Sequence, residues 1–308
     1  MRPITLFQAV GAWMVGRLLV IQASSPSSIS IGKELAAMAA VYLSYGVGMV
    51  ANDSADAALD AAAKNDTPSQ SRGDNNHIVP ISSTSKTKKS QRAIASGRIT
   101  VKQGWIFTGI LSVLAMTVAQ FGVRAASPQF SLWCASNLVF MLLYAAGLQN
   151  LFLIKNLLVG WLFISPLWGA KTLATTTSTI QNHKMTLLAV AGFALGVVRE
   201  VLKDIQDVEL DKGTKSTLPI VLGIPLTQRI SMLALGGTLA VLQTPLYRRS
   251  FCASPLLYSV TWGSATVMCL WAALSGNNEI DKQQSMVKKS IYVLLLGLIA
   301  NMMMMTGK

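Results

Sequence analysis

The sequence predicts an all-α fold, a bundle of nine transmembrane helices in an integral membrane protein. Of the 308 residues, 52% are hydrophobic and only 13% are charged, and the mean hydropathy is +0.47. Soluble domains carry about 25% charged residues. The chain also contains repeated apolar stretches of the length that crosses a bilayer, about 20 residues. We expect residues 1–308 to form a single domain.

Nine apolar stretches alternate with polar connections. The first, MRPITLFQAVGAWMVGRLLVIQ, has a basic start but no clear small-residue cleavage site, which favours a retained helix over a signal peptide. Several later stretches are interrupted by Gly, Ser or Thr, as is common where membrane helices pack closely. The predicted helices cover residues 4–22, 34–51, 104–123, 130–149, 156–174, 185–202, 227–245, 254–275 and 286–305.

The basic residues divide unequally between the two sides that nine helices would create. The N-terminus and the connections after the second, fourth, sixth and eighth helices carry 17 of the 26 Lys and Arg residues, and the opposite side carries seven. The richer side should face the cytoplasm, or the matrix or stroma of an organelle, without indicating which membrane. Nucleic-acid binding is disfavoured despite the net charge of +13, because the basic residues lie between apolar spans.

One connection differs from the others in length and composition. Residues 64–91, KNDTPSQSRGDNNHIVPISSTSKTKKSQ, are rich in Ser, Asn, Thr and Lys. Such a segment buries too little apolar surface to order itself, so we expect a disordered insertion. The alternative is a mobile lid whose lysines attract an anionic substrate.

Two stretches of the sequence repeat one spacing of aspartates, D-x-x-D-x-x-x-D. They occupy residues 52–60 and 203–211 and, with Glu209, hold seven of the 13 acidic residues. On a helix, steps of three and seven residues return to nearly the same face. Both stretches follow a predicted helix on the basic side. The first cluster contains Asp53, Asp56 and Asp60, and the second contains Asp204, Asp207 and Asp211.

Carboxylates in this number at the ends of membrane helices require positive charge beside them. Mg²⁺ takes oxygen ligands and is typically held by one or two carboxylates together with substrate phosphate. Two facing clusters therefore predict two or three Mg²⁺ ions around a diphosphate. Nearby Arg and Lys residues would stabilise the charge of a departing diphosphate, although they are also explained as ordinary charges at the membrane surface. These residues are Arg92, Arg98, Arg199, Lys203, Lys212 and Lys215.

The two motifs resemble those of the UbiA superfamily of membrane-embedded prenyltransferases. The first family motif is N-D-x-x-D-x-x-x-D followed by R-P-x-x-x-G, which is similar to the stretch from Asn52 and to that from Arg92. The second is similar to K-D-x-x-D-x-x-x-D with a later G-x-x-T-x-P, matched at 203–211 and 213–219. Tyr144 and Lys155 also resemble family features. The chain departs from the family by an insertion at 69–91, by Ala93 in place of proline, and by Gln149 where lysine is common.

The resemblance implies Mg²⁺-dependent transfer of a prenyl group from an allylic polyprenyl diphosphate to an aromatic or other lipid-precursor acceptor. The acceptor would belong to quinone, tocopherol, chlorophyll or ether-lipid biosynthesis, and the prenyl tail would lie among the apolar helices and open toward membrane lipid. The implied metal ligands are Asn52, Asp53, Asp56, Asp60, Asp204, Asp207 and Asp211. The implied catalytic residues are Asp56, Arg92, Lys203, Asp207 and Asp211, and the implied diphosphate-binding residues are Asn52, Arg92, Arg98, Tyr144, Lys155, Lys203 and Lys215.

Two other functions stay open at this point. A cation-coupled transporter would also contain membrane carboxylates, but it would place them near the middle of the membrane and not at helix ends. A prenyl-lipid-binding protein without catalysis would have less need for so many costly carboxylates.

Overall fold

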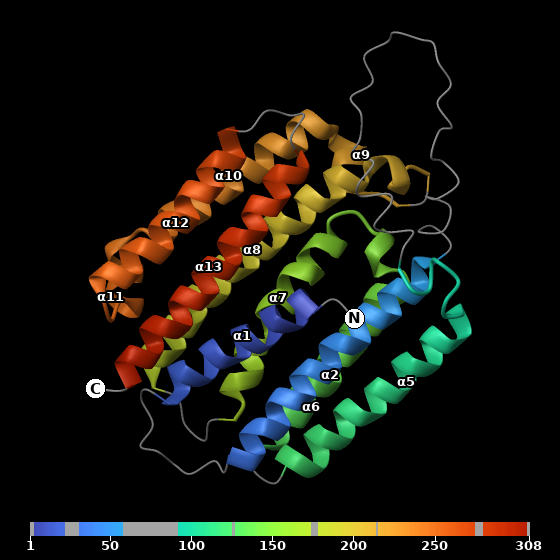
Figure 1. Cartoon of the computed structure of the whole chain (residues 1–308), viewed down its shortest axis with the longest axis horizontal. Coiled ribbons are helices and arrows are strands. Elements are labelled where there is room, and N and C mark those ends of the chain that lie inside the picture. Colours follow the sequence, from blue (N-terminus) through green and yellow to red (C-terminus); the bar gives the residue numbers. More distant parts are fainter. Residues whose placement is uncertain are drawn as a thin grey trace.

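The computed structural model describes residues 3–21, 31–57, 92–124, 127–173, 178–213, 215–274 and 280–306. Within these ranges the regular structure is entirely helical. The long helices lie side by side with alternating directions in one elongated bundle (Figure 1). The polar segment 64–91 and Asp60 lie outside the described residues.

Each predicted apolar segment overlaps one long helix in the described part of the chain. Five of these helices have the length and hydropathy needed to cross a membrane, and a sixth span results if α10 and the short α11 (Pro245–Phe251), which meet at 61°, form one. The prediction of nine crossings therefore stays a prediction. The long helices are α1 (Pro3–Ile21), α2 (Ile31–Ala55), α5 (Val101–Thr117), α6 (Pro128–Ala146), α7 (Ile154–Lys171), α8 (Thr179–Asp211), α10 (Ile224–Leu242), α12 (Pro255–Leu274) and α13 (Ile280–Thr306).

Short elements adjust the ends of these helices. A π-helical segment, η1 (Val118–Val123), extends α5, a 3₁₀ turn, η2 (Leu148–Asn150), precedes α7, and α9 (Leu218–Leu222) precedes α10. Two starts carry capping boxes. Thr100 and Gln103 exchange hydrogen bonds at the start of α5, and Ser178 and Gln181 do so at the start of α8.

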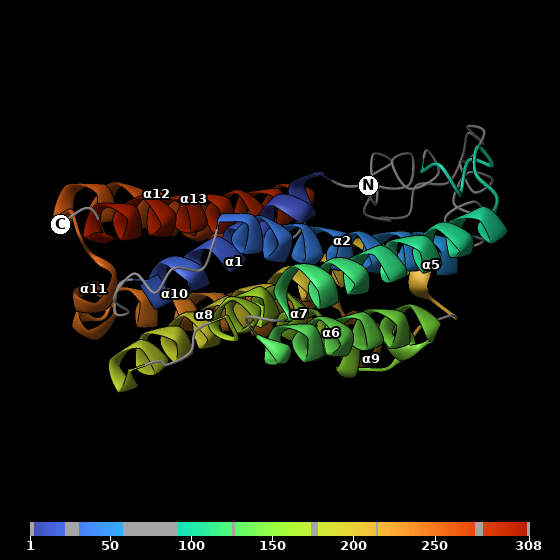
Figure 2. The ribbon, with the colours of Figure 1, turned by 90° about the horizontal axis from the view of Figure 1, so that it is seen from below.

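The bundle has two layers, and α1 of one layer packs against α7 of the other. In the view of Figure 2, α12, α13, α1, α2 and α5 lie above α10, α8, α7 and α6. One buried apolar cluster contains residues of α1, α7, α8, α10, α12 and α13, and the other contains residues of α1, α2, α5, α6 and α7. A Cβ on Gly16 would lie 2.7 Å from the Cβ of Ala170, so α1 and α7 pack at close range.

The outer surface of the bundle is apolar. Large side chains such as Phe121, Leu233 and Leu256 are exposed on η1, α10 and α12. Exposed apolar side chains over so many helices suit a surface that faces lipid tails and not water. The structure thus supports the prediction of an integral membrane protein.

Candidate functional site

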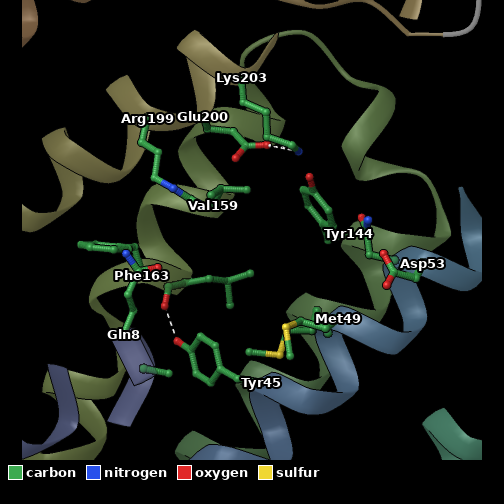
Figure 3. Close-up of a pocket in the computed structure, with 15 residues that line it drawn as sticks. Gln8, Tyr45, Met49, Asp53, Tyr144, Val159, Phe163, Arg199, Glu200 and Lys203 are labelled. Atoms are coloured by element: carbon green, nitrogen blue, oxygen red, sulfur yellow. Dashed lines mark hydrogen bonds and ion pairs between the residues drawn. The ribbon is translucent and has the colours of Figure 1, made fainter. Parts of the chain in front are cut away.

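A cavity of about 180 Å³ lies among α1, α2, α6, α7 and α8 (Figure 3). Polar residues line it where α2 and α8 approach their C-terminal ends, among them Asn52, Asp53 and Lys203. Much of the remaining wall is apolar and includes Met49 and Phe163. An amphipathic cavity of this kind suits a ligand with a charged head and an apolar chain.

The first aspartate cluster lies at the C-terminal end of α2. Arg92 Nη1 contacts Asp53 Oδ1 at 3.1 Å, and Asn52 Nδ2 donates a hydrogen bond to Asp56 Oδ2 at 3.1 Å. The neighbouring α5 fixes this end of the helix, because a Cβ on Gly104 would lie 2.3 Å from Ser54 Oγ. Asn52 and Asp53 of this helix end line the cavity.

The second cluster lies within the last turns of α8. Asp204 is fully buried, and its two carboxylate oxygens contact Lys155 Nζ and Asn156 Nδ2, the latter at 2.9 Å. Asp207 and Asp211 are also buried. The structure therefore places Asp204 as the partner of Lys155 and Asn156 on α7.

Lys215 joins the two clusters. Its Nζ lies 3.2 Å from Asp56 Oδ1 and 3.8 Å from Asp211 Oδ1. The backbone N–H of Ser216 donates to the carbonyl of Asn150 at 3.2 Å, which holds the segment after α8 against the turn before α7. Two motifs about 150 residues apart in the sequence thus meet at one end of the bundle.

The remaining predicted residues are placed differently. Tyr144 and Lys203 line the cavity, whereas Lys155 is buried against Asp204 and is not part of the cavity wall. Arg98 is exposed and donates to Ser96 Oγ at 3.1 Å. The structure thus brings Arg92 into contact with a carboxylate of the first cluster.

Among the cavity residues, Glu200 and Gln8 are polar side chains that the sequence interpretation did not name. Glu200 lines the cavity and lies 3.2 Å from Lys203 Nζ and 3.9 Å from Lys155 Nζ. Its position four residues before Asp204, which continues the acidic face by one turn, was the available signal. Gln8 on α1 also lines the cavity, and no sequence pattern marked it.

The described residues fit Mg²⁺ only in company with a substrate. Among them, no three His, Cys, Asp or Glu side chains lie close enough together to hold a metal ion by themselves. The oxygen donors of Asn52, Asp53, Asp56, Asp207 and Asp211 are nevertheless the kind that hold Mg²⁺ when phosphate oxygens and water complete the coordination.

Comparison with known proteins decides the family. The model of the UbiA prenyltransferase family matches residues 12–296. The chain belongs to this family. The resemblance seen in the two aspartate motifs is thereby confirmed. The chain is a prenyltransferase and a multi-pass membrane protein.

Individual relatives agree with the family. The chain is 26% identical over 300 residues to the digeranylgeranylglyceryl phosphate synthase of Methanosarcina barkeri, covering 94% of this chain and 92% of the relative. The structure resembles a UbiA homologue from Aeropyrum pernix with a TM-score of 0.72 at 14% identity, over 98% of this chain and 99% of that one. It also resembles a UbiA homologue from Archaeoglobus fulgidus bound to DMAPP and Mg²⁺, with a TM-score of 0.57 at 13% identity over 97% of each chain.

Proposed function

We propose that this UbiA prenyltransferase attaches the prenyl group of an allylic polyprenyl diphosphate to the hydroxyl of an isoprenoid glyceryl phosphate, the ether-lipid type of acceptor. The observation that carries the proposal is the meeting of the two aspartate clusters through Lys215 beside an amphipathic cavity. The choice of acceptor is supported by the digeranylgeranylglyceryl phosphate synthase that the chain resembles over nearly its whole length.

The donor's diphosphate would lie at the end of the cavity where α2 and α8 meet. Asn52, Asp53 and Asp56 would hold Mg²⁺ from one side, and Asp207 and Asp211 from the other. Bound there, Mg²⁺ would neutralise charge on the diphosphate. The UbiA homologue from Archaeoglobus fulgidus, whose structure was determined with DMAPP and Mg²⁺ bound, shares this fold.

The basic residues would stabilise the leaving group. Arg92, Lys203 and Lys215 each contact a carboxylate of the site, so each already lies beside the expected diphosphate position. Their N–H groups can donate to phosphate oxygens as negative charge grows there. Lys155 would act indirectly, through its contacts with Asp204 and Glu200.

The reaction exchanges one C–O bond for another. The bond between C1 of the prenyl chain and the diphosphate oxygen breaks, and its electron pair leaves with diphosphate. The acceptor's hydroxyl oxygen forms the new bond to C1, and its proton passes to the released diphosphate or to solvent. The apolar walls, including Met49, Met141 and Leu162, would bind the prenyl tail and keep water from the allylic cation.

Purified protein in lipid nanodiscs provides the test. Labelled geranylgeranyl diphosphate is supplied with geranylgeranylglyceryl phosphate, 4-hydroxybenzoate, homogentisate, dihydroxynaphthoate or chlorophyllide, with Mg²⁺ or EDTA, and products are identified by mass spectrometry. A Mg²⁺-dependent ether product is expected. A product only with an aromatic acceptor or chlorophyllide would overturn the choice of acceptor. No product with any acceptor, from folded protein and with several donor lengths, would favour lipid binding without catalysis.

A further inference from the structure

Arg199 differs from the other cations around the cavity. It lies on α8 four residues before Lys203, lines the cavity, and has a buried Nε with no hydrogen-bond partner. A buried N–H without an acceptor is unfavourable, and more so on a charged group. The other cations of the site contact carboxylates, in the pairs Arg92–Asp53, Lys155–Asp204, Lys203–Glu200 and Lys215–Asp56.

A second unsatisfied donor lines the same cavity. Gln8 on α1 is 5% exposed, and its Nε2 is buried with no hydrogen-bond partner. In Figure 3, Arg199 and Gln8 lie on one side of the cavity, and Asp53 and Tyr144 lie on the other. Tyr45, also in the wall, is different, because its hydroxyl donates to the carbonyl of Leu162.

The neighbourhood of Arg199 can accept an anion. Glu200 is the adjacent carboxylate, and Lys203 and Lys155 lie 3.2 and 3.9 Å from it. Lys203 is therefore the nearer counter-charge of Glu200, and Lys155 is shared with Asp204. The buried Nε of Arg199 has no hydrogen-bond partner and can donate to an external oxyanion. Guanidinium and carboxamide N–H groups together suit the several oxygens of a phosphate.

An apolar extension adjoins this side of the cavity. A second cavity of about 80 Å³ lies among α1, α7, α8, α12 and α13, and Gln8 and Phe163 line both cavities. Its other walls include Leu167, Leu195 and Leu294. A lipid with its head at Gln8 could therefore place the first part of its chain in a separate apolar space, whereas a small aromatic acid would leave that space unused.

We propose that Arg199 and Gln8 bind the phosphate of the acceptor, with the beginning of the acceptor's isoprenoid chain directed toward the second cavity. This inference rests on the proposed function and names the residues that select its acceptor. The donor's diphosphate belongs to the aspartate clusters, so the two anionic heads occupy opposite sides of one cavity. The acceptor's hydroxyl then faces C1 of the donor from the side away from the leaving group.

Steady-state kinetics of Arg199→Gln and Gln8→Leu in nanodiscs test the assignment. Loss of a charge-assisted hydrogen bond to phosphate should raise the KM for geranylgeranylglyceryl phosphate about 10- to 100-fold for Arg199→Gln, and less for Gln8→Leu. The KM for geranylgeranyl diphosphate should change less than about twofold. Arg249→Gln, an exposed arginine on α11, is the matched control and should leave both values unchanged.

A binding measurement gives a readout apart from turnover. The acceptor should raise the Tm of the wild type and of Arg249→Gln but not of Arg199→Gln, whereas donor with Mg²⁺ should raise all three. Geranylgeranylglycerol, which lacks the phosphate, should bind wild type and Arg199→Gln equally. If Arg199→Gln does not fold, Gln8→Leu and Arg199→Lys carry the same comparison.

The contrary outcomes are distinct. Unchanged acceptor KM and Tm shift in both variants would overturn the assignment while leaving the proposed function intact. An equal rise in donor KM would instead assign Arg199 to the leaving diphosphate. Selective loss of 4-hydroxybenzoate binding would identify a carboxylate site and overturn the phosphate assignment. A wild type that forms no glyceryl phosphate product would overturn the proposed function itself.

Discussion

The two aspartate clusters share one sequence pattern but occupy different environments. At the end of α2, the side chains of Asp53 and Asp56 are 26% and 15% exposed. Their basic partners, Arg92 and Lys215, come from segments outside the helices. On α8, the side chain of Asp204 keeps 0% and contacts Lys155 of α7. The matched first aspartates differ in their neighbours, because Asp53 contacts Arg92 from outside the helices and Asp204 contacts Lys155 of α7. The same spacing therefore places a partly exposed aspartate on one helix and a buried packing contact on the other.

The largest effect should come from breaking the buried pair. Asp204→Asn removes the nearer carboxylate of Lys155 and leaves the buried ammonium with only Glu200 at 3.9 Å. Breaking a buried pair costs about 3–5 kcal/mol, so we expect a loss of that order or less. We expect a clear fall in Tm in detergent, measured by intrinsic fluorescence. Asp204→Leu combined with Lys155→Met should recover much of the loss, because it removes both charges together. Unchanged stability in Asp204→Asn would show that Asp204 is not a packing residue.

Asp207→Asn, one turn along the same helix, should act on turnover. An amide is a poorer Mg²⁺ ligand than a carboxylate, so we expect a fall in kcat/KM on the order of 100-fold with little change in Tm. The Mg²⁺ concentration for half-maximal rate should rise as well. Wild-type kinetics at matched protein levels would contradict the metal assignment, and a fall in Tm like that of Asp204→Asn would place both residues in the packing contact.

Lys215→Met tests the link between the clusters. The variant loses the ammonium that lies 3.2 Å from Asp56 Oδ1 and 3.8 Å from Asp211 Oδ1. We expect about a 10-fold rise in the KM for the prenyl diphosphate, because one donor to the phosphate oxygens is removed. Lys102→Met, an exposed lysine on α5, is the control. Donor KM values that are equal in the two variants would show that Lys215 does not bind the diphosphate.

Sequence patterns predicted the helices and the clusters better than they predicted individual roles. The length of an apolar stretch predicts a membrane helix because the stretch must match the thickness of the bilayer. Every predicted segment overlaps a described helix. The spacing of aspartates on α2 and α8 likewise predicted a shared face. It could not report that Asp204 points at α7, since that depends on the packing of α7 beside α8. Gln8 was identified as a site residue only when the structure brought α1 and α8 to one cavity, where it lies with Arg199.

The smallest effect should follow from shortening the polar segment that separates the first cluster from Arg92. Deleting residues 69–90 leaves residues 58–68 and 91 to connect 57 with 92, a chain that can span about 40 Å. The distance to be bridged is short, because Arg92 Nη1 lies 3.1 Å from Asp53 Oδ1. Polar segments of this composition tolerate deletion. The Tm should therefore stay close to that of the wild type, and kcat/KM should stay within about twofold of the wild-type value. A rise in donor KM that high salt reproduces in the wild type would instead support the lid, because the lost lysines would then have been attracting the diphosphate. In both cases the α8 cluster serves as the internal comparison, because no such insertion separates Asp211 from its basic partner Lys215.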